Sequence, residues 1–384
     1  MGFLRNKILQ ISIISIAILL TGCAKSLIQV ILNDDKNSHP MFGKTNAREF
    51  YVPVNISDSL EFIWEEDAHG SFTNSSVVYK DSIIFVSDLG GRIHCFDLLT
   101  GKQIGMLRSK GTVYSTPLIY NYKLIYALCD NKDEETQLIF YDMNDGKELF
   151  ISEIEGRVLT QMLIEDGDVI LCTENGSVQK ISSAGKNIWQ FDTKSKLYCN
   201  PALINEVVLV GNDNGEIVAV NSRTGLEVYR KKIAAPFYSG ITINESSAYI
   251  ADNEGVIYSF DVDNCNVNWS YDTKSRILMN PAVDAENVYI GNLKGELYSI
   301  NKLSGKLNWK SDLGGLLNST PLITNNRIIM INLNRYFSII NKENGLITKT
   351  IELEGRGKLS PVLIDNKLII GYDDGMIRAY EFVY

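Results

Sequence analysis

Residues 201–229 read PALINEVVLVGNDNGEIVAVNSRTGLEVY, and the rest of the chain repeats their pattern. Short apolar runs at Pro201–Ile204, Val207–Gly211 and Glu216–Val220 alternate with turns, and a fourth run carries Tyr229. Runs of β-branched residues with Asn-Gly between two of them are typical of strands joined by hairpins. The stretch therefore predicts a four-stranded antiparallel meander of about forty residues.

The unit recurs along the chain at a nearly fixed period. Its first residue stands at Val77, Pro117, Met162, Pro201, Ile241, Pro281, Pro321 and Pro361. The intervals are 40, 45, 39, 40, 40, 40 and 40 residues, and an insertion at Lys132–Thr136 accounts for the longest. A fixed period of this length indicates a repeat architecture.

Two further positions recur within the unit. A hairpin glycine follows fourteen residues after the unit's start, at Gly91, Gly176, Gly215, Gly255, Gly295 and Gly375. A later turn ends in glycine in most units, as in Asp145-Gly146 and Thr224-Gly225, and Asn264-Cys265 stands in once. Four residues after this turn an aromatic residue follows, at Phe150, Trp189, Tyr229, Trp269 and Trp309. Gly105 and Lys349 take the aromatic position in two units.

The two ends of the repeat complement each other. The last unit, from Pro361 to Tyr380, has three strands, and Leu60–Glu65 with Trp64 precedes the first unit as an unpaired fourth strand. We expect this strand to complete the last sheet, because a ring closed in this way leaves no open seam. The predicted fold is all-β, an eight-bladed β-propeller of four-stranded antiparallel blades. A linear β-solenoid is the alternative.

The first residues predict an export signal. Arg5 and Lys7 precede an apolar run at Ile8–Leu20, which is shorter than the roughly 20 residues that a membrane helix needs. Leu20-Thr21-Gly22-Cys23 then looks like a bacterial lipobox, with cleavage before Cys23 and lipid attached to that residue. An uncleaved anchor is the alternative. The expected organisation is a signal peptide over 1–22, the lipidated Cys23 and a polar tether over 23–58, and the propeller over 59–384.

Composition argues against several functions. The 384 residues carry a formal charge of −9, whereas a nucleic-acid-binding domain needs a basic face. The chain has three histidines, and its cysteines show no metal-binding spacing. No G-x-S-x-G motif occurs, and His94 fits a packed position in a strand. We therefore expect no catalytic residues, no metal and no cofactor.

The Thr/Ser-Gly-x-x-x-Trp spacing, the hairpin glycine and the period resemble the pyrroloquinoline-quinone (PQQ)-like propeller repeat. Together with the lipobox, the repeat is similar to the BamB family of outer-membrane assembly lipoproteins. This resemblance implies that aromatic rings dock between blades. It also implies a location on the outer membrane, facing the periplasm, and outer-membrane β-barrel assembly proteins as partners. Quinoprotein dehydrogenases share the repeat, and the resemblance to them implies long insertions around a cofactor pocket and often adjacent cysteines over the cofactor, none of which this chain has.

The remaining candidates for function are surface loops between blades. Aromatic and large apolar residues are favoured at interfaces, and the candidate partner-binding residues are Leu197, Tyr198, Phe237, Tyr238, Leu316 and Leu317. The alternative is that these side chains pack inward over the blade ends. The sequence thus favours a non-enzymatic, lipid-anchored scaffold, a monomer within a complex. The other hypotheses are a cell-envelope propeller that binds a glycan, peptide or small molecule, and a PQQ-dependent dehydrogenase.

Overall fold

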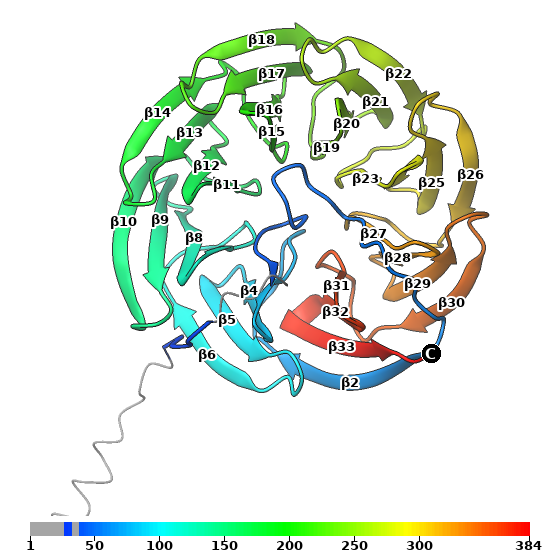
Figure 1. Ribbon diagram of the computed structural model, residues 1–384, viewed down its shortest axis with the longest axis horizontal. Helices are drawn as coiled ribbons and strands as arrows, with labels where there is room; N and C mark the ends of the chain where they lie inside the picture. The colour runs from blue at the N-terminus through cyan, green and yellow to red at the C-terminus, as the bar shows by residue number, and fades with distance from the viewer. Residues whose placement is uncertain (1–26, 33–37) are drawn as a thin grey trace, which may run out of the picture.

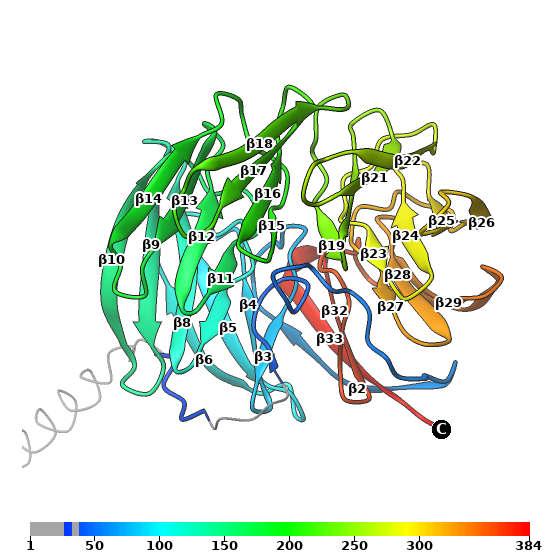
Figure 2. The ribbon, with the colours of Figure 1, turned by 45° about the horizontal axis from the view of Figure 1, so that its top comes forward.

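Within residues 27–32 and 38–384, which the computed structural model describes, eight antiparallel sheets stand around a central channel (Figure 1). The predicted eight-bladed propeller is confirmed. The first strand of each blade lies innermost and the fourth forms the outer rim, as the tilted view of Figure 2 also shows.

The blades follow one another in chain order. Blade 1 consists of β3 (Val78–Lys80), β4 (Ile83–Ser87), β5 (Arg92–Asp97) and β6 (Gln103–Arg108). Blade 2 consists of β7 (Leu118–Tyr120), β8 (Lys123–Asp130), β9 (Glu135–Asp142) and β10 (Lys147–Glu155). Blade 3 consists of β11 (Leu163–Glu165), β12 (Asp168–Cys172), β13 (Ser177–Ile181) and β14 (Asn187–Asp192). Blade 4 consists of β15 (Ala202–Ile204), β16 (Val207–Gly211), β17 (Glu216–Asn221) and β18 (Glu227–Lys232).

The second half of the ring repeats this order. Blade 5 consists of β19 (Thr242–Asn244), β20 (Ser247–Ala251), β21 (Val256–Asp261) and β22 (Val267–Asp272). Blade 6 consists of β23 (Ala282–Val283), β24 (Asn287–Gly291), β25 (Glu296–Asn301) and β26 (Leu307–Asp312). Blade 7 consists of β27 (Leu322–Ile323), β28 (Arg327–Ile331), β29 (Tyr336–Asn341) and β30 (Ile347–Glu352).

Blade 8 joins the two ends of the ring. It contains β31 (Val362–Ile364), β32 (Lys367–Tyr372), a single 3-10 turn η1 (Asp373–Gly375) and β33 (Met376–Phe382). Its fourth strand is β2 (Leu60–Asp67), which pairs antiparallel with β33 so that Trp64 lies opposite Ala379 (Figure 1). The predicted closure by the early strand is confirmed.

The hairpin glycines fit their turns for two reasons. Gly215 has a φ of +75°, which a glycine adopts without steric cost. In addition, a Cβ at this position would collide with the carbonyl oxygen of Ala234 in the following loop. The Asn-Gly signal in the sequence therefore marks both a left-handed turn and a close approach of two main-chain segments.

The four tryptophans fasten neighbouring blades together. Each indole N–H donates to a main-chain carbonyl of the next blade over 2.8 to 3.0 Å, and the pairs are Trp64 with Leu98, Trp189 with Ser222, Trp269 with Lys302, and Trp309 with Lys342. Each ring also lies so close to the turn glycine of that blade that an added Cβ would meet ring atoms within 2.5 to 2.7 Å. The expected docking of aromatic rings between blades is confirmed.

The interpretation of residues 23–58 as a polar tether is wrong for residues 38–58. β1 (Ser38–His39) pairs with β3, and residues 40–54, here called the plug, run inside the ring (Figures 1 and 2). The plug's carbonyl groups accept the main-chain N–H groups of four innermost strands, in the pairs Pro40 with Ile119, Asn46 with Leu203, Ala47 with Ile243, and Phe50 with Ile323. The inner strand edges carry donors that need partners, and the plug supplies them. The predicted signal peptide and Cys23 lie outside the described residues.

Candidate functional site

The loops that enter each blade and the turns between second and third strands form one face, here called the loop face. A main-chain hydrogen bond recurs around this face, from the second residue of each turn to the preceding loop. Examples are Asp213 N–H to Lys196 O at 3.0 Å and Leu333 N–H to Leu316 O at 3.0 Å. The repeat therefore holds the loops rigidly against the blade ends.

The structure divides the six predicted partner-binding residues into two groups. Leu197, Phe237 and Leu317 have 0% exposure and pack between the blades, so they are not available as surface anchors. Tyr198 and Tyr238 are half-buried and Leu316 is 42% exposed. In each loop the buried residue is next in sequence to an exposed or half-buried one. One side chain of each pair packs into the core, and the other points outward.

Tyr198 and Tyr238 meet where the loops of blades 4 and 5 approach each other. Their ring centroids are 5.5 Å apart. The Tyr238 hydroxyl donates to Asp213 Oδ1 over 2.5 Å, and this bond raises the pKa of Tyr238. An aromatic pair with one hydroxyl already oriented suits contact with another protein, because little side-chain freedom would be lost on binding.

The loop face is ionic in some places and apolar in another. Arg157 pairs with Glu174, and Arg356 Nε lies 2.5 Å from Asp373 Oδ2. The equivalent positions at the boundary of blades 6 and 7 are Leu316 and Leu333, which is half-buried. This exchange replaces an ion pair by two leucines and leaves a small apolar patch at that boundary.

A belt of polar side chains surrounds the channel beside the loop face. The residue two positions before the first strand of a blade accepts, through its side-chain oxygen, the main-chain N–H of its counterpart in the preceding blade. The distances are 2.8 to 3.1 Å, and the pairs are Thr116 with Ser76, Gln161 with Thr116, Asn200 with Gln161, and Ser360 with Thr320. Asn200 Nδ2 donates to Asn280 Oδ1 over 2.9 Å. Gly240 lies between them, and a Cβ there would collide with Asn280.

Arg48 holds the plug beneath this belt. Its side chain has 0% exposure and donates to the carbonyl oxygens of Phe42, Gln161, Met162 and Pro201 over 2.8 to 3.1 Å. No carboxylate pairs with it among the described residues. Burial lowers the pKa of Arg48 to about 9, so the guanidinium remains charged at neutral pH. Its five N–H donors in a fixed plane suit several carbonyls at once.

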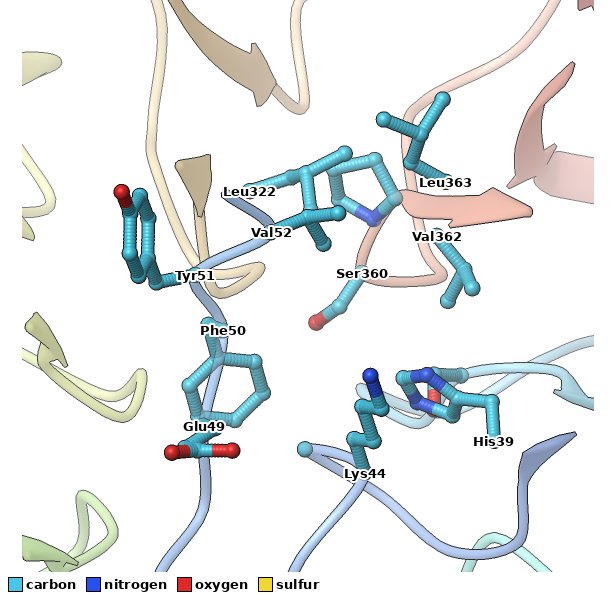
Figure 3. A pocket seen from close by; sticks show the side chains of 13 residues that line it. His39, Lys44, Glu49, Phe50, Tyr51, Val52, Leu322, Ser360, Val362 and Leu363 are labelled. Carbon is cyan, nitrogen blue, oxygen red and sulfur yellow. The ribbon is translucent and has the colours of Figure 1, made fainter. Parts of the chain in front are cut away.

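A small void remains beside the plug, next to the inner strands of blades 7 and 8 (Figure 3). Apolar side chains line much of it, together with His39, Lys44 and Ser360. Its free volume is about 20 Å³, which is room for about one water molecule. The Nε2 atom of His39 is buried and has no hydrogen-bond partner within the described part of the chain. The plug therefore leaves no space for an organic cofactor at this point in the channel.

A larger polar hollow lies on the opposite face, here called the turn face, between blades 6 and 7. Its volume is about 560 Å³, and its lining includes Tyr51, Asn287, Asn308, Asn325 and Lys342. Lys342 Nζ lies 2.8 Å from Asp284 Oδ2 and 5.6 Å from the centre of the Tyr51 ring. Burial raises the pKa of Asp284, but hydrogen bonds from Lys342 and from two main-chain N–H groups outweigh it and lower the pKa overall. Such a hollow offers amides, a hydroxyl and one ion pair to a polar ligand.

His94 is held in a buried polar cluster of blade 1. Its Nε2 atom lies 2.9 Å from Asp88 Oδ2, and Arg92 Nε donates to the same carboxylate oxygen over 2.6 Å. Both His94 and Asp88 are 1% exposed or less, so the cluster has no access to a substrate. No group of three or more His, Cys, Asp or Glu in the described ranges is arranged to hold a metal ion.

Sequence reasoning missed Arg48 and the plug. The stretch 38–58 has no strand periodicity and mixes polar with apolar residues, so only its position before the repeats stood out. The five cysteines at positions 95, 129, 172, 199 and 265 are buried and unpaired, as small apolar residues would be. In the part of the chain that the structure describes, no helix is long and apolar enough to cross a membrane.

Comparison with known proteins identifies a family. The family model described as outer membrane protein assembly factor BamB matches residues 131–197, 174–280 and 273–381. A BamB of Nitrosomonas eutropha is 21% identical over 308 residues, which cover 71% of this chain and 70% of that protein. A BamB of Yersinia pestis is also 21% identical, over 60% of this chain and 59% of that protein. This chain thus aligns with less than two thirds of the second relative.

Solved structures show the same fold at low identity. The crystal structure of BamB from Moraxella catarrhalis matches with a TM-score of 0.72 and 17% identity, covering 84% of this chain and 100% of that chain. Quinohemoprotein alcohol dehydrogenase from Comamonas testosteroni matches with a TM-score of 0.74 and 12% identity, covering 90% of this chain and 80% of that chain. At these identities the structural matches establish the propeller alone.

Proposed function

Because the chain belongs to the family of outer membrane protein assembly factor BamB, we propose that it is a non-enzymatic, lipid-anchored scaffold that docks on the outer-membrane β-barrel assembly machinery. The proposed location is the outer membrane, facing the periplasm, with Cys23 as the lipidated residue. The loop face is the proposed docking surface, with Tyr198, Tyr238 and Leu316 as its accessible candidates.

The plug is the observation that carries the non-enzymatic part of the proposal. It runs through the channel and leaves room for only about one water molecule beside blades 7 and 8, and Arg48 ties it to blades 3 and 4. A propeller enzyme that binds a cofactor in its channel would need that space. The side chains that a partner or ligand can reach therefore lie on the outer faces of the ring, which supports a binding role.

The test is co-purification from detergent-solubilised envelopes, with two leucine variants compared. Leu316→Asp changes an exposed residue of the loop face, and Leu303→Asp changes an exposed residue of the turn face, where Leu303 is 81% exposed. We expect Leu316→Asp to weaken recovery of the barrel-insertase subunit about tenfold, the effect of losing a modest apolar anchor, while Leu303→Asp recovers it normally. Absence of that subunit from the wild-type eluate would refute the proposal. Equal losses in both variants would refute the loop face.

The polar hollow on the turn face favours a second candidate function, recognition of a polar ligand such as a glycan. Ligand sites are concave and combine aromatic side chains with a few directed polar groups. Asn308 Nδ2 donates to Asn287 Oδ1 at the edge of the hollow. Neutral oligosaccharides would then raise the midpoint temperature of unfolding of the wild type but not that of Asn308→Ala. Normal porin levels in a strain that lacks the protein would favour this function over the first.

A further inference from the structure

The boundary between blades 1 and 2 is built differently from the boundaries that contain a tryptophan. Blade 1 has Gly105 where six of the other blades carry an aromatic ring and blade 7 carries Lys349, so this boundary lacks an indole. Residues 27–32, here called the strap, lie there instead, with Ile28 at 0% and Val30 at 9% exposure. Both belong to the apolar cluster that includes Cys95 of blade 1 and Tyr141 of blade 2.

The strap makes the contacts that an indole makes elsewhere. At the tryptophan boundaries an indole N–H reaches a carbonyl such as Leu98 O or Ser222 O. Met143 is the equivalent residue in blade 2, and its carbonyl accepts the main-chain N–H of Val30 over 2.8 Å. The turn glycine of blade 2, Gly146, faces Gln29 Cβ, just as its counterparts face tryptophan rings.

Two more contacts fix the strap in place. The buried Tyr141 hydroxyl donates to Ile28 O over 2.9 Å, and Gln29 Nε2 donates to Asn144 O over 3.2 Å. A Cβ on Gly105 would lie 2.5 Å from Leu27 O and 3.1 Å from Ile28 Cα. The missing side chain at Gly105 is therefore the space that the strap's main chain occupies.

The strap limits how far the rim of blades 1 and 2 can lie from a membrane, and this step rests on the proposed lipidation of Cys23. Leu27 lies four positions after Cys23, and an extended chain spans at most about 3.5 Å per residue, so the reach from Leu27 to Cys23 is at most about 14 Å. If the strap were free, the next described residue with a main-chain pairing would be Ser38, fifteen positions after Cys23, and the reach would be at most about 50 Å. We propose that the strap replaces the missing indole at Gly105 and thereby holds the rim of blades 1 and 2 against the lipid surface.

The first experiment tests the strap without any lipid. Gly105→Trp restores the ring that other boundaries carry and removes the strap's space, and Gly105 has no positive φ that would oppose a side chain. Lys349→Trp is the matched control, since it adds the same ring at the other exceptional position of the repeat. Hydrogen exchange of the unlipidated Cys23→Ser chain should show the Val30 amide exchanging at least about tenfold faster in Gly105→Trp than in the wild type or in Lys349→Trp.

The second experiment measures orientation on vesicles. The lipidated protein carries one dye, at Lys147→Cys beside the strap or at Lys306→Cys, which follows the equivalent turn glycine in blade 6. Headgroup-labelled acceptor lipids should quench the dye at position 147 several-fold more than the dye at position 306. Gly105→Trp should remove this difference, because the longer tether lets the propeller turn. Ile28→Asp provides a second way to release the strap if Gly105→Trp does not fold.

The strap and the lipid anchor can each fail without the other. Equal quenching at both positions in the lipidated wild type would overturn the membrane-facing rim. An unchanged Val30 exchange rate in both Gly105→Trp and Ile28→Asp would overturn the strap. A mass spectrum of the wild type that shows no lipid on Cys23 would refute the proposed anchor and the orientation with it, whereas the exchange experiment would still decide whether the strap fills the boundary.

Discussion

Replacement of Arg48 by methionine tests how the plug is held. The variant loses four hydrogen bonds from a charged donor, at about 1.5–3 kcal/mol each. It also removes the cost of burying the guanidinium. The fall of its pKa from 12.5 to about 9 corresponds to a cost of about 5 kcal/mol. The difference leaves the plug less stable by about 4 kcal/mol, with a range of roughly 1 to 7 kcal/mol.

Hydrogen exchange locates this loss within the molecule. The amides of Ile119, Leu203, Ile243 and Ile323 donate to plug carbonyls, and release of the plug by about 4 kcal/mol would accelerate their exchange about a thousandfold. The amides that pair β16 with β17 should remain protected from exchange, because that ladder does not involve the plug. Arg48→Lys should also release the plug, since an ammonium cannot reproduce the planar fork. Unchanged exchange at all four amides in Arg48→Met would refute the assignment of Arg48 as the plug's main fastening.

Three further predictions concern the ring itself. Trp269→Ala should lower the free energy of unfolding by about 3–5 kcal/mol, measured in urea, and a loss no larger than that of the exposed Leu303→Ala would contradict the role of the indole. Burial lowers the pKa of His39 from 6.5 to about 4, so the folded state binds fewer protons than the unfolded state in this window. Stability should therefore fall by about 3 kcal/mol as the pH drops from 6.5 to 4, and denaturation of His39→Gln should lack this part of the pH dependence. Burial also raises the pKa of the thiols of Cys95, Cys129, Cys172, Cys199 and Cys265, so alkylation at pH 8 should label them only after unfolding, and fast labelling of the native protein would argue against the buried positions.

Local sequence predicted the blades well, because each strand and turn carries its own signal. The expected strand Val207–Gly211 coincides with β16, and Glu216–Val220 falls one residue short of β17. Alternation of apolar residues and the glycine turns are properties of neighbouring residues, and they need no knowledge of distant contacts. Closure by β2 was also predictable, since a surplus strand at one end matched a missing strand at the other.

The candidate site was only partly predictable, because burial in a loop depends on what lies beneath it. Leu197 and Tyr198 are adjacent and both large, yet only the leucine fills the space between blades. The strap shows the same limit. Gly105 stood out as an exception to the repeat, but the residue that fills its boundary, Ile28, lies 77 positions earlier in the chain. No local pattern connects a missing ring with so distant a replacement.

The pairing of β2 with β33 also sets an order of events during folding. The two strands are separated by about three hundred residues, and Leu60 cannot pair until its partner in the ladder, Phe382, has been synthesised. Contacts between such distant segments form late, because closing a long loop costs entropy before any contact compensates for it. Until that final step the edge of β33 is open to strands of other molecules, so newly synthesised chains are most exposed to mispairing before the ring closes.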